Sequence, residues 1–495
     1  MQIKMDVPES VIAPHKKVHE PIEANEDVVA SDLNEEQQAA YFALLRGENV
    51  FLSGYAGTGK TYVLTKFIDV LHKHGKNVIC CAPSGKAAQN LRHGMTVHRA
   101  FNIPIGILTT DNDLKTPPKA VRNAEVVIID EVSMLRIDTF EFICRQLNKA
   151  EHMSRIPKQL VVVGDFFQLS PVITKREEAA FQELYPDAPQ GFAFQGEMWK
   201  ACRFHSFNLH EIMRQRDTTF QDNLNKIRVG DLSAFPYFNN MVGSPRDELD
   251  KYIHICGTNR EADSRNEKAL ANLPGKTYAI EAEEEGKVGK GDKVAPETLR
   301  VKEGARVMFL VNDTEENLYQ NGSGGTIEDI DLAGGWIGIE TDEGNYVKLQ
   351  RHSWDVEVPT VTHGTDKEGN PVVRVDTRTI GTYTQFPIKL GYAITIHKSQ
   401  GQTYDRVIVD PNCFDNGMLY VALSRGSDPE KMFLSYPVPP SALMVSEEVK
   451  EFYEGFDEAV APVIDKSIIK IDCPAYLSDI VSDYISELQH SLEFN

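Results

Sequence analysis

Apolar residues gather in short, unbroken runs within the first 200 residues, and polar or helical stretches separate these runs. The runs are Asn49–Ser53, Asn77–Ala82, Ala124–Ile129 and Gln159–Val163. Strands that are covered on both faces have this continuous hydrophobicity, whereas half-exposed strands alternate. After the first run, Tyr62–Leu71 carries apolar residues at helical spacing. The pattern predicts an α/β domain with a parallel sheet over residues 31–200.

A second series of apolar runs predicts another α/β unit, over residues 201–303 and 377–440. Its expected strands are Tyr252–Cys256, Leu390–Ile396, Arg406–Asp410 and Met432–Tyr436. Glycine turns and alternating strands interrupt the series between Gly304 and about Asp376, a composition typical of a small β-barrel inserted into the unit. A shorter polar insertion with three prolines lies between Asn102 and Lys119.

The two ends of the chain have a different character from the middle. Residues 1–30 mix charges with prolines and show no sustained period, which indicates a flexible arm. Residues 441–495 form an acidic extension, and from Ser446 onward they include 12 acidic and 3 basic residues. Helical spacing near Leu477–Leu488 would allow this extension to pack on the body, which we favour, or to bind a protein partner.

Composition indicates a globular protein without a membrane segment. The chain has 495 residues, of which 41% are hydrophobic and 25% charged, and no apolar stretch is long enough to span a bilayer. The seven cysteines are scattered without metal-ligand spacing, so we expect reduced, mostly buried thiols and no zinc site. The net charge of −21 weakens a nucleic-acid hypothesis but leaves room for a local basic groove.

Between the first run and its helix lies a complete G-x-x-x-x-G-K-[ST] loop, Gly54–Thr61. Such a loop turns backbone N–H groups onto phosphate oxygens, its lysine binds the β- and γ-phosphates, and its last hydroxyl holds Mg²⁺. We therefore expect ATP to bind at five loop positions before the hydroxyl, with Thr61 as a metal ligand. These five are Gly54, Gly57, Thr58, Gly59 and Lys60. An ordinary glycine-rich turn is the alternative, but strand, loop and helix agree.

Three more polar positions carry candidate chemistry. Asp130 and Glu131 end an apolar run, where the first acid would hold Mg²⁺ and the second would activate water, on a strand we expect next to the phosphate loop. Gln168 follows the last run and could sense the γ-phosphate, while the neighbouring Phe166 and Phe167 could equally be core residues. Gln37 fits a capping box with Asn34, and we weigh that role equally with adenine recognition.

Taken together, these segments resemble superfamily-one, B-branch DNA helicases, closest to the PIF-type (petite-integration-frequency) and RecD-like enzymes. They follow the family's order over about residues 31–436. The matching segments are Leu33-x-x-Glu36-Gln37, Gly54–Thr61, Ala82–Ala88, Thr96–His98, Asp130–Met134, Gly164–Val172, Met213–Gln215, Thr258–Arg260, Arg306–Met308 with Asn321-Gly322, His397–Thr403 and Tyr420–Arg425. Two departures, Ser84 for the usual threonine and Ser170 for a proline, conserve hydroxyl chemistry or size.

The resemblance implies two RecA-like P-loop domains with ATP and Mg²⁺ in the cleft between them and single-stranded DNA across their top. The family's strand-separating wedge would fall at 102–119, and its SH3-like barrel at 304–376. Arg214 and Arg425 would be arginine fingers, and Gly401 would contact the nucleotide. The residues expected to contact DNA are Pro83, Ser84, His98, Asn259, His397, Lys398 and Ser399. For the arginines the alternative is a surface ion pair, and for the two histidines a core position.

These expectations favour a monomeric, ATP-dependent DNA helicase that moves 5′-to-3′ on single-stranded and forked DNA, the direction resting on resemblance alone. Replication, repair or recombination would be its setting. It would act in the cytoplasm at the nucleoid in a bacterium or phage, and in the nucleus of a eukaryote. The alternatives are a non-motor ATP switch that recruits partners and a subunit of a nuclease complex.

Overall fold

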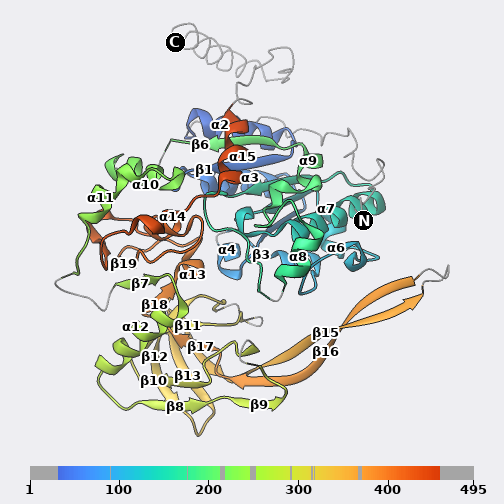
Figure 1. Cartoon of the computed structure of the whole chain (residues 1–495). Coiled ribbons are helices and arrows are strands. Elements are labelled where there is room, and N and C mark those ends of the chain that lie inside the picture. The colour runs from blue at the N-terminus through green and yellow to red at the C-terminus, as the bar shows by residue number, and fades with distance from the viewer. Residues whose placement is uncertain are drawn as a thin grey trace.

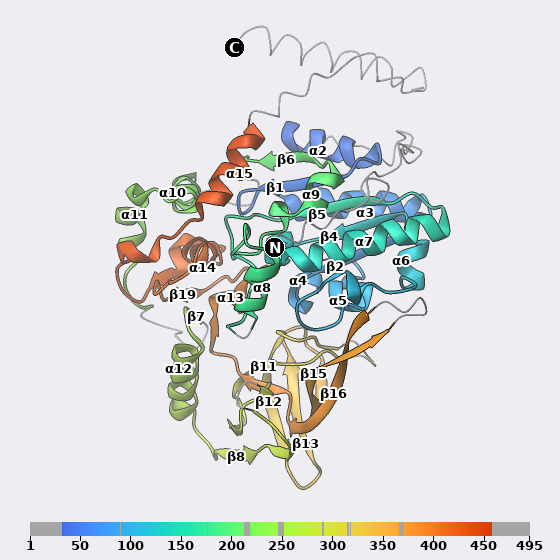
Figure 2. The ribbon, with the colours of Figure 1, turned by 45° about the vertical axis from the view of Figure 1, so that its right-hand side comes forward.

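The computed structural model describes residues 32–89, 91–175, 177–211, 218–245, 252–289, 292–313, 316, 318–365 and 371–457. Two parallel sheets lie side by side, and an antiparallel body lies beneath them (Figures 1 and 2). The arm at residues 1–30 and the helix expected near Leu477–Leu488 fall outside the described residues. No helix in the described ranges is long and apolar enough to cross a membrane.

The first sheet has six parallel strands in the order β3-β2-β4-β5-β1-β6. Its strands are β1 (Val50–Gly54), β2 (Val78–Ala82), β3 (Met95–Thr96), β4 (Val126–Ile129), β5 (Gln159–Val163) and β6 (His205–Leu209). Its helices are α2 (Glu35–Leu45), α3 (Lys60–Lys73), α4 (Gly85–Gln89), α5 (Val97–Phe101), α6 (Lys119–Asn123), α7 (Ile137–Ser154), α8 (Glu178–Leu184) and α9 (Glu197–Cys202). The unbroken apolar runs therefore mark parallel strands, as predicted.

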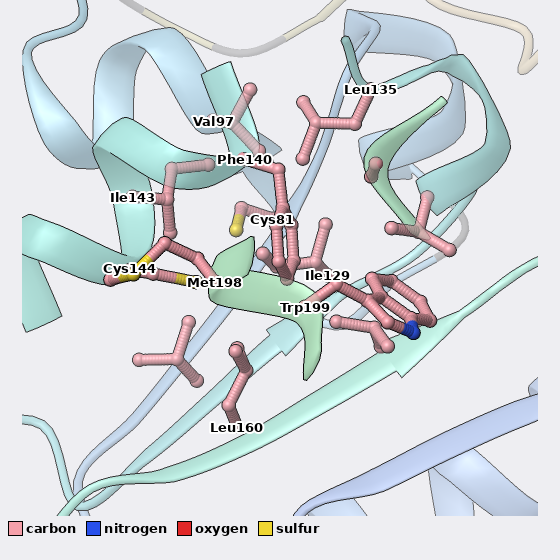
Figure 3. Close-up of a cluster of buried hydrophobic side chains, with 14 of the residues drawn as sticks. Cys81, Val97, Ile129, Leu135, Phe140, Ile143, Cys144, Leu160, Met198 and Trp199 are labelled. Carbon is pink, nitrogen blue, oxygen red and sulfur yellow. The ribbon is translucent and has the colours of Figure 1, made fainter. Parts of the chain in front are cut away.

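Helices cover both faces of this sheet, and this explains the continuous hydrophobicity of its strands. Along β1, Val50 and Leu52 face the core beneath α2 and α3, whereas Phe51 faces the core beneath α7 and α9. Figure 3 shows part of this second core, where Phe140 of α7 and Trp199 of α9 lie over the sheet. Covering both faces removes apolar surface from water on each side of the sheet. This burial stabilises the fold by about 25 cal/mol for each Å² of apolar surface.

Two expectations about the first sheet were wrong. The boundary at residue 200 comes too early, because β6 pairs with β1 along its whole length and belongs to the first sheet. The acidic pair after β4 is not on the strand next to the phosphate loop, because β5 lies between β4 and β1. Sequence order does not reveal this insertion, since parallel strands are joined by crossovers.

The second sheet has four parallel strands in the order β18-β7-β19-β20. They are β18 (Ala393–Thr395), β7 (Ile253–Cys256), β19 (Val407–Val409) and β20 (Met432–Leu434). The accompanying helices are α10 (Thr218–Val229), α11 (Phe235–Asn239), α12 (Asn259–Asn272), α13 (Ile396–Ser399) and α14 (Met418–Leu423). With the first sheet, this one confirms the predicted α/β fold of two parallel-sheet units.

The antiparallel body is larger than the insertion expected at 304–376. Five strands pair in the order β14-β13-β12-β11-β17, and β15 and β16 form a long hairpin that extends away from them (Figure 1). The strands are β8 (Tyr278–Glu281), β9 (Glu283–Gly286), β10 (Thr298–Val301), β11 (Arg306–Phe309), β12 (Gly324–Asp331), β13 (Trp336–Thr341), β14 (Tyr346–Gln350), β15 (His352–Thr365), β16 (Pro371–Gln385) and β17 (Ile388–Leu390). The run expected as one strand at Leu390–Ile396 is thus divided, because β17 pairs with β11 and β18 pairs with β7.

The insertion at 102–119 is mostly irregular and lies against α7. Arg145 holds Asp113 at 2.9 Å, and the Asp138 carboxylate accepts a hydrogen bond from the backbone of Leu108. Ile105 stands 87% exposed in this segment.

The described part of the chain ends in α15 (Glu447–Asp457), which packs on the first sheet, so this piece of the acidic extension does lie on the body. The six cysteines among the described residues are free thiols.

Candidate functional site

The phosphate loop occupies the turn between β1 and α3, as its sequence predicts. Gly54 has φ +149°, and a side chain there would come within 2.5 Å of the Leu209 carbonyl oxygen. Gly57 and Gly59 have φ +85° and +78°, in the left-handed region that favours glycine. Gly59 is the N-cap of α3, so no side chain caps this helix, and its first turn carries no acid. The positive end of the helix is therefore left for an anion.

Lys60 begins α3 and points back over the loop. Its ammonium donates hydrogen bonds to the carbonyl oxygens of Gly54, at 2.7 Å, and Tyr55, at 2.9 Å. Desolvation lowers the pKa of Lys60, and the charges of Asp165 and Glu131 oppose that change. The cation is thus held at the centre of the loop, where phosphate oxygens would replace or join the carbonyls as its acceptors.

Gln37 has the capping role that we considered for it. Asn34 and Gln37 form a reciprocal capping box at the start of α2, with the Asn34 side chain accepting from the Gln37 N–H at 2.8 Å. The Gln37 amide also donates to the carbonyl oxygen of Thr58 at 2.9 Å. Gln37 therefore ties α2 to the phosphate loop, and the adenine role stays a prediction.

The two carboxylates after β4 are crowded together. Asp130 is 7% exposed and accepts a hydrogen bond from the backbone N–H of Glu131. Burial, followed by the neighbouring charge of Glu131, raises the pKa of Asp130 to about 7. Burial likewise raises the pKa of Glu131, although the charges of Arg425 and Lys60 pull it down. A pair of acids with raised pKa values in a desolvated site favours a cation nearby.

A pocket of about 630 Å³ joins the two domains at this point. From the first domain it is lined by Lys60, Thr61, Asp130, Glu131, Gly164 and Gln168. From the second domain it is lined by Gly401, Gln402, Thr403 and Ser427. Six of the predicted site residues therefore meet in one place, and Gly401 is the one that comes from the second domain.

The lining residues fit Mg²⁺. The Thr61 hydroxyl and the Asp130 carboxylate line the same pocket, and both are hard oxygen donors of the kind that Mg²⁺ takes with phosphate oxygens and water. Burial and the charge of Glu131 raise the pKa of Asp130 more than Lys60 lowers it, so a bound metal cation would stabilise the ionised carboxylate. Among the described residues, no group of three or more His, Cys, Asp or Glu could hold a metal by itself, so the fit is to a metal shared with phosphate.

Gln400 is a site residue that the sequence reasoning missed. Its amide nitrogen lies 3.3 Å from a carboxylate oxygen of Glu131 and 3.5 Å from the side-chain oxygen of Gln168. It thus connects the second domain to both groups expected to handle the attacking water and the γ-phosphate. Gln400 lies inside the segment His397–Thr403 that carries the family resemblance, so the signal was present but unused.

Tyr420 was missed as well. Its hydroxyl accepts a hydrogen bond from the backbone N–H of Ala56, in the phosphate loop, at 3.0 Å. At the start of the same helix, α14, Gly417 lies so close to the Gln168 loop that a Cβ would come within 2.4 Å of the Gln168 carbonyl oxygen. Helix α14 of the second domain therefore contacts both the phosphate loop and the loop that carries Gln168.

Of the two expected arginine fingers, the structure describes one. Arg425 is 6% exposed, and its guanidinium donates to the carbonyl oxygens of Gln402, at 2.8 Å, and Ser399, at 3.3 Å. It supports the loop that lines the pocket, and its charge lowers the pKa of Glu131. It is not a surface ion pair. Arg214 lies outside the described residues.

The residues expected to contact DNA differ in exposure. His98, Asn259 and Lys398 are exposed, and Pro83, Ser84 and His397 are half-buried, so His98 is not a core histidine. Ser84 also accepts a hydrogen bond from the Ala87 N–H at 3.2 Å. Ser399 is fully buried, and its hydroxyl donates to the Ile396 carbonyl oxygen at 2.7 Å. The Ser399 side chain therefore offers no surface to DNA, and that expectation was wrong.

P-loop nucleoside triphosphatases with two RecA-like domains share this arrangement of a nucleotide pocket closed by a second parallel sheet, and this chain is one of them. The family model described as PIF1-like helicase matches residues 32–235, and the UvrD-like helicase C-terminal domain matches residues 390–428. The ATP-dependent DNA helicase Pif1 of Campylobacter jejuni is 31% identical over 418 residues, which cover 79% of this chain and 89% of that protein. The chain belongs to the PIF1-like helicase family.

Solved structures agree with this membership. The crystal structure of Bacteroides Pif1 bound to single-stranded DNA is 30% identical, with a TM-score of 0.74 over 86% of this chain and 97% of that one. A structure of two coordinating Pif1 helicases at forked duplex DNA is 31% identical, with a TM-score of 0.72 over 86% of this chain and 98% of that one.

Proposed function

We propose that this chain is an ATP-dependent DNA helicase that moves 5′-to-3′ along single-stranded DNA and unwinds duplex DNA ahead of it. One observation carries the motor activity: the nucleotide pocket takes its lining from both parallel-sheet domains. Hydrolysis in such a pocket depends on how the two domains lie, so each ATP cycle can close and open the cleft. The direction follows from the family resemblance.

The pocket residues of the first domain would have distinct roles in this cycle. Lys60 would bind the β- and γ-phosphates, Thr61 and Asp130 would hold Mg²⁺, and Glu131 would accept the proton of the attacking water. The metal would neutralise charge on the phosphate oxygens. Gln168 reports the γ-phosphate to the second domain through its contact with Gln400, 3.5 Å away.

Arg425 acts from the second domain. A cation delivered across a cleft makes hydrolysis depend on closure. Its buried guanidinium already braces the loop from Ser399 to Gln402 beside the pocket, so closure needs to move this loop and the arginine together. We assign Arg214 the same role on resemblance.

The DNA would cross the exposed edge of both domains. Exposed His98, Asn259 and Lys398, with half-buried Pro83, Ser84 and His397, offer the mixture of backbone contacts and stacking that suits binding without sequence preference. The insertion at 102–119 would separate the strands, with the exposed Ile105 as an apolar wedge. We propose a monomeric motor that acts at the nucleoid or in the nucleus, in replication, repair or recombination. The acidic extension would pack on the body, which we favour, or bind a protein partner.

Directional unwinding tests the proposal. Forked duplexes that carry only a 5′ or only a 3′ single-stranded tail are incubated with ATP and Mg²⁺, and ATP hydrolysis is measured with and without single-stranded DNA. We expect unwinding from the 5′ tail and hydrolysis stimulated many-fold by DNA. Unwinding only from the 3′ tail would refute the direction, and turnover indifferent to DNA would favour a non-motor ATP switch.

A further inference from the structure

The last described helix, α15, follows the second domain in sequence but packs on the first (Figures 1 and 2). Val449, Tyr453 and Phe456 lie on its buried face. Phe452 stacks on Phe194 with 4.2 Å between ring centroids and lies within 5.6 Å of Phe166. The chain therefore returns from the second sheet to close the core behind the catalytic loops of the first.

The hydroxyl of Tyr453 connects two of those loops. It lies 2.5 Å from the hydroxyl of Ser53, the residue before the phosphate loop, and accepts a hydrogen bond from the backbone N–H of Phe166 at 3.2 Å. Phe166 precedes Gln168 by two residues, and β1 and β5 are adjacent strands. A single side chain thus holds the roots of the phosphate loop and of the loop expected to sense the γ-phosphate.

The ring of Tyr453 is also one wall of a cage around Arg228. This arginine lies on α10, whose buried apolar residues Phe220, Leu224 and Ile227 belong to the core of the second domain. Its guanidinium forms a two-pronged ion pair with Asp165, at 3.0 and 2.9 Å, and both side chains are at most 3% exposed. The ring centroids of Tyr55, Phe167 and Tyr453 lie 4.6, 4.1 and 5.2 Å from the central carbon of the Arg228 guanidinium.

The cage joins the two domains. Tyr55 belongs to the phosphate loop. Asp165 and Phe167 belong to the segment Gly164–Val172 that carries Gln168, here called the sensing loop, and Arg228 belongs to α10 of the second domain. Burial alone would lower the pKa of Arg228, but the Asp165 carboxylate more than compensates, so the guanidinium stays charged. A buried pair of this kind is costly to break, because one partner would remain as an unpaired buried charge.

We propose that Tyr453 is a positioning residue for ATP hydrolysis, which holds the phosphate loop and the sensing loop in register with the Arg228–Asp165 joint between the domains. The proposal rests on the proposed ATPase but not on the direction of movement. Tyr453 is not among the residues that line the nucleotide pocket, and it acts through Ser53 and the backbone of Phe166. A small misplacement of catalytic groups strongly lowers the rate of the chemical step, so we expect the contacts of the Tyr453 hydroxyl to affect turnover.

The test is Tyr453→Phe in the full-length chain, which keeps the ring and its packing and removes the hydroxyl. We expect kcat for ATP to fall about tenfold, the loss that corresponds to one hydrogen bond of transition-state positioning. The KM for ATP should stay within about twofold, because the phosphate loop itself is intact. The matched control is Tyr383→Phe, which removes a hydroxyl that donates to the Ala295 carbonyl oxygen in the antiparallel body, and it should keep kcat unchanged.

A double-mutant cycle separates positioning from a purely structural role. Ser53→Ala and Tyr453→Phe should lower kcat by less in combination than the product of their separate effects, because each removes the same contact. Multiplicative effects, or an unchanged kcat with only a lower Tm, would overturn the proposal. Basal hydrolysis without DNA suffices for this measurement. If the wild-type enzyme hydrolyses ATP but does not unwind from a 5′ tail, the proposed direction of movement is wrong. The effect of Tyr453→Phe on kcat still tests the role of Tyr453 in that case.

Discussion

The two parallel sheets each contain a strand that leads into a 14-residue helix, but the two junctions are built differently. Between β1 and α3 the N-cap is Gly59, no side chain caps the helix, and its first turn has no acid. Between β7 and α12 the N-cap is Thr258, whose hydroxyl accepts from the Glu261 N–H, and Glu261 adds a negative charge to the first turn. One helix end is left for an outside anion, and the other is satisfied from within.

The difference shows that the domains do not share the nucleotide equally. On the proposed mechanism the first would bind phosphate with its backbone, while the second supplies loop residues around Gly401 and the buried Arg425. Because the pocket takes its lining from both domains, the contribution of the second domain depends on the relative position of the two sheets. The comparison predicts how strongly substitutions reduce ATP hydrolysis. The reduction should be largest in the junction between β1 and α3 and smallest in the junction between β7 and α12.

Lys60→Ala should have the largest effect. Loss of the cation from the uncapped helix end should reduce ATP hydrolysis by about 10³-fold or more, to background, because the charge acts on phosphate oxygens as the bond breaks. Steady-state ATPase with saturating single-stranded DNA measures it. The control is Lys66→Ala on the same helix, which breaks a surface ion pair with Asp32 and a cation–π contact with Tyr62 and should change turnover by less than about twofold.

Arg425→Ala should come next, with hydrolysis reduced about 10²-fold. Nucleotide affinity, measured by titration with a fluorescent ATP analogue, should change little, since phosphate binding belongs to the first domain. Arg406→Ala, in the same domain but at a surface pair 3.6 Å from Asp405, is the control. Normal turnover in the Arg425 variant would remove this residue from the catalytic set and leave it a structural support of the 399–402 loop.

Gln400→Ala should have an intermediate effect. Its contacts with Glu131 and Gln168 are 3.3 and 3.5 Å long, so we expect a loss of about tenfold in kcat, comparable with one weak hydrogen bond in the transition state. The effect should fall on kcat rather than on the KM for ATP. Stopped-flow measurement of phosphate release in single turnover isolates the chemical step. A loss confined to KM would contradict the proposed contact.

Thr258→Ala should have the smallest effect and tests the other junction. Removal of an N-cap hydroxyl costs about 1 kcal/mol of stability, which lowers Tm by about 2–4 °C in a domain of this size. ATP hydrolysis per folded molecule, without DNA, should be unchanged. Thermal melts and activity at a temperature well below Tm measure the two quantities. A large fall in turnover with unchanged Tm would mean that the second junction also takes part in chemistry.

In the first sheet the sequence predicted the central strands correctly and the edge strands poorly, whereas in the second sheet it also predicted the edge strand β20. The runs at 49–53, 77–82, 124–129 and 159–163 became β1, β2, β4 and β5, because strands covered on both faces must be apolar throughout. The edge strand β6 (His205–Leu209) was missed, since most of it is partly exposed and its residues are mixed. The run across Gly391 concealed two strands of different sheets, because hydrophobicity reports burial but not the partner.

The candidate site was likewise predicted where it depends on consecutive residues and missed where it depends on tertiary contacts. By itself the sequence determined the phosphate loop, the acidic pair and the sensing glutamine, because each depends on a few consecutive residues whose backbone and charge requirements are local. Only the tertiary structure decided that β5 lies between β1 and β4, that Gln400 reaches Glu131 across 269 positions, and that Tyr453 reaches Ser53 across 400. Such meetings depend on which surfaces pack together over the whole molecule, and that choice is made by the summed free energy of burial rather than by any one segment.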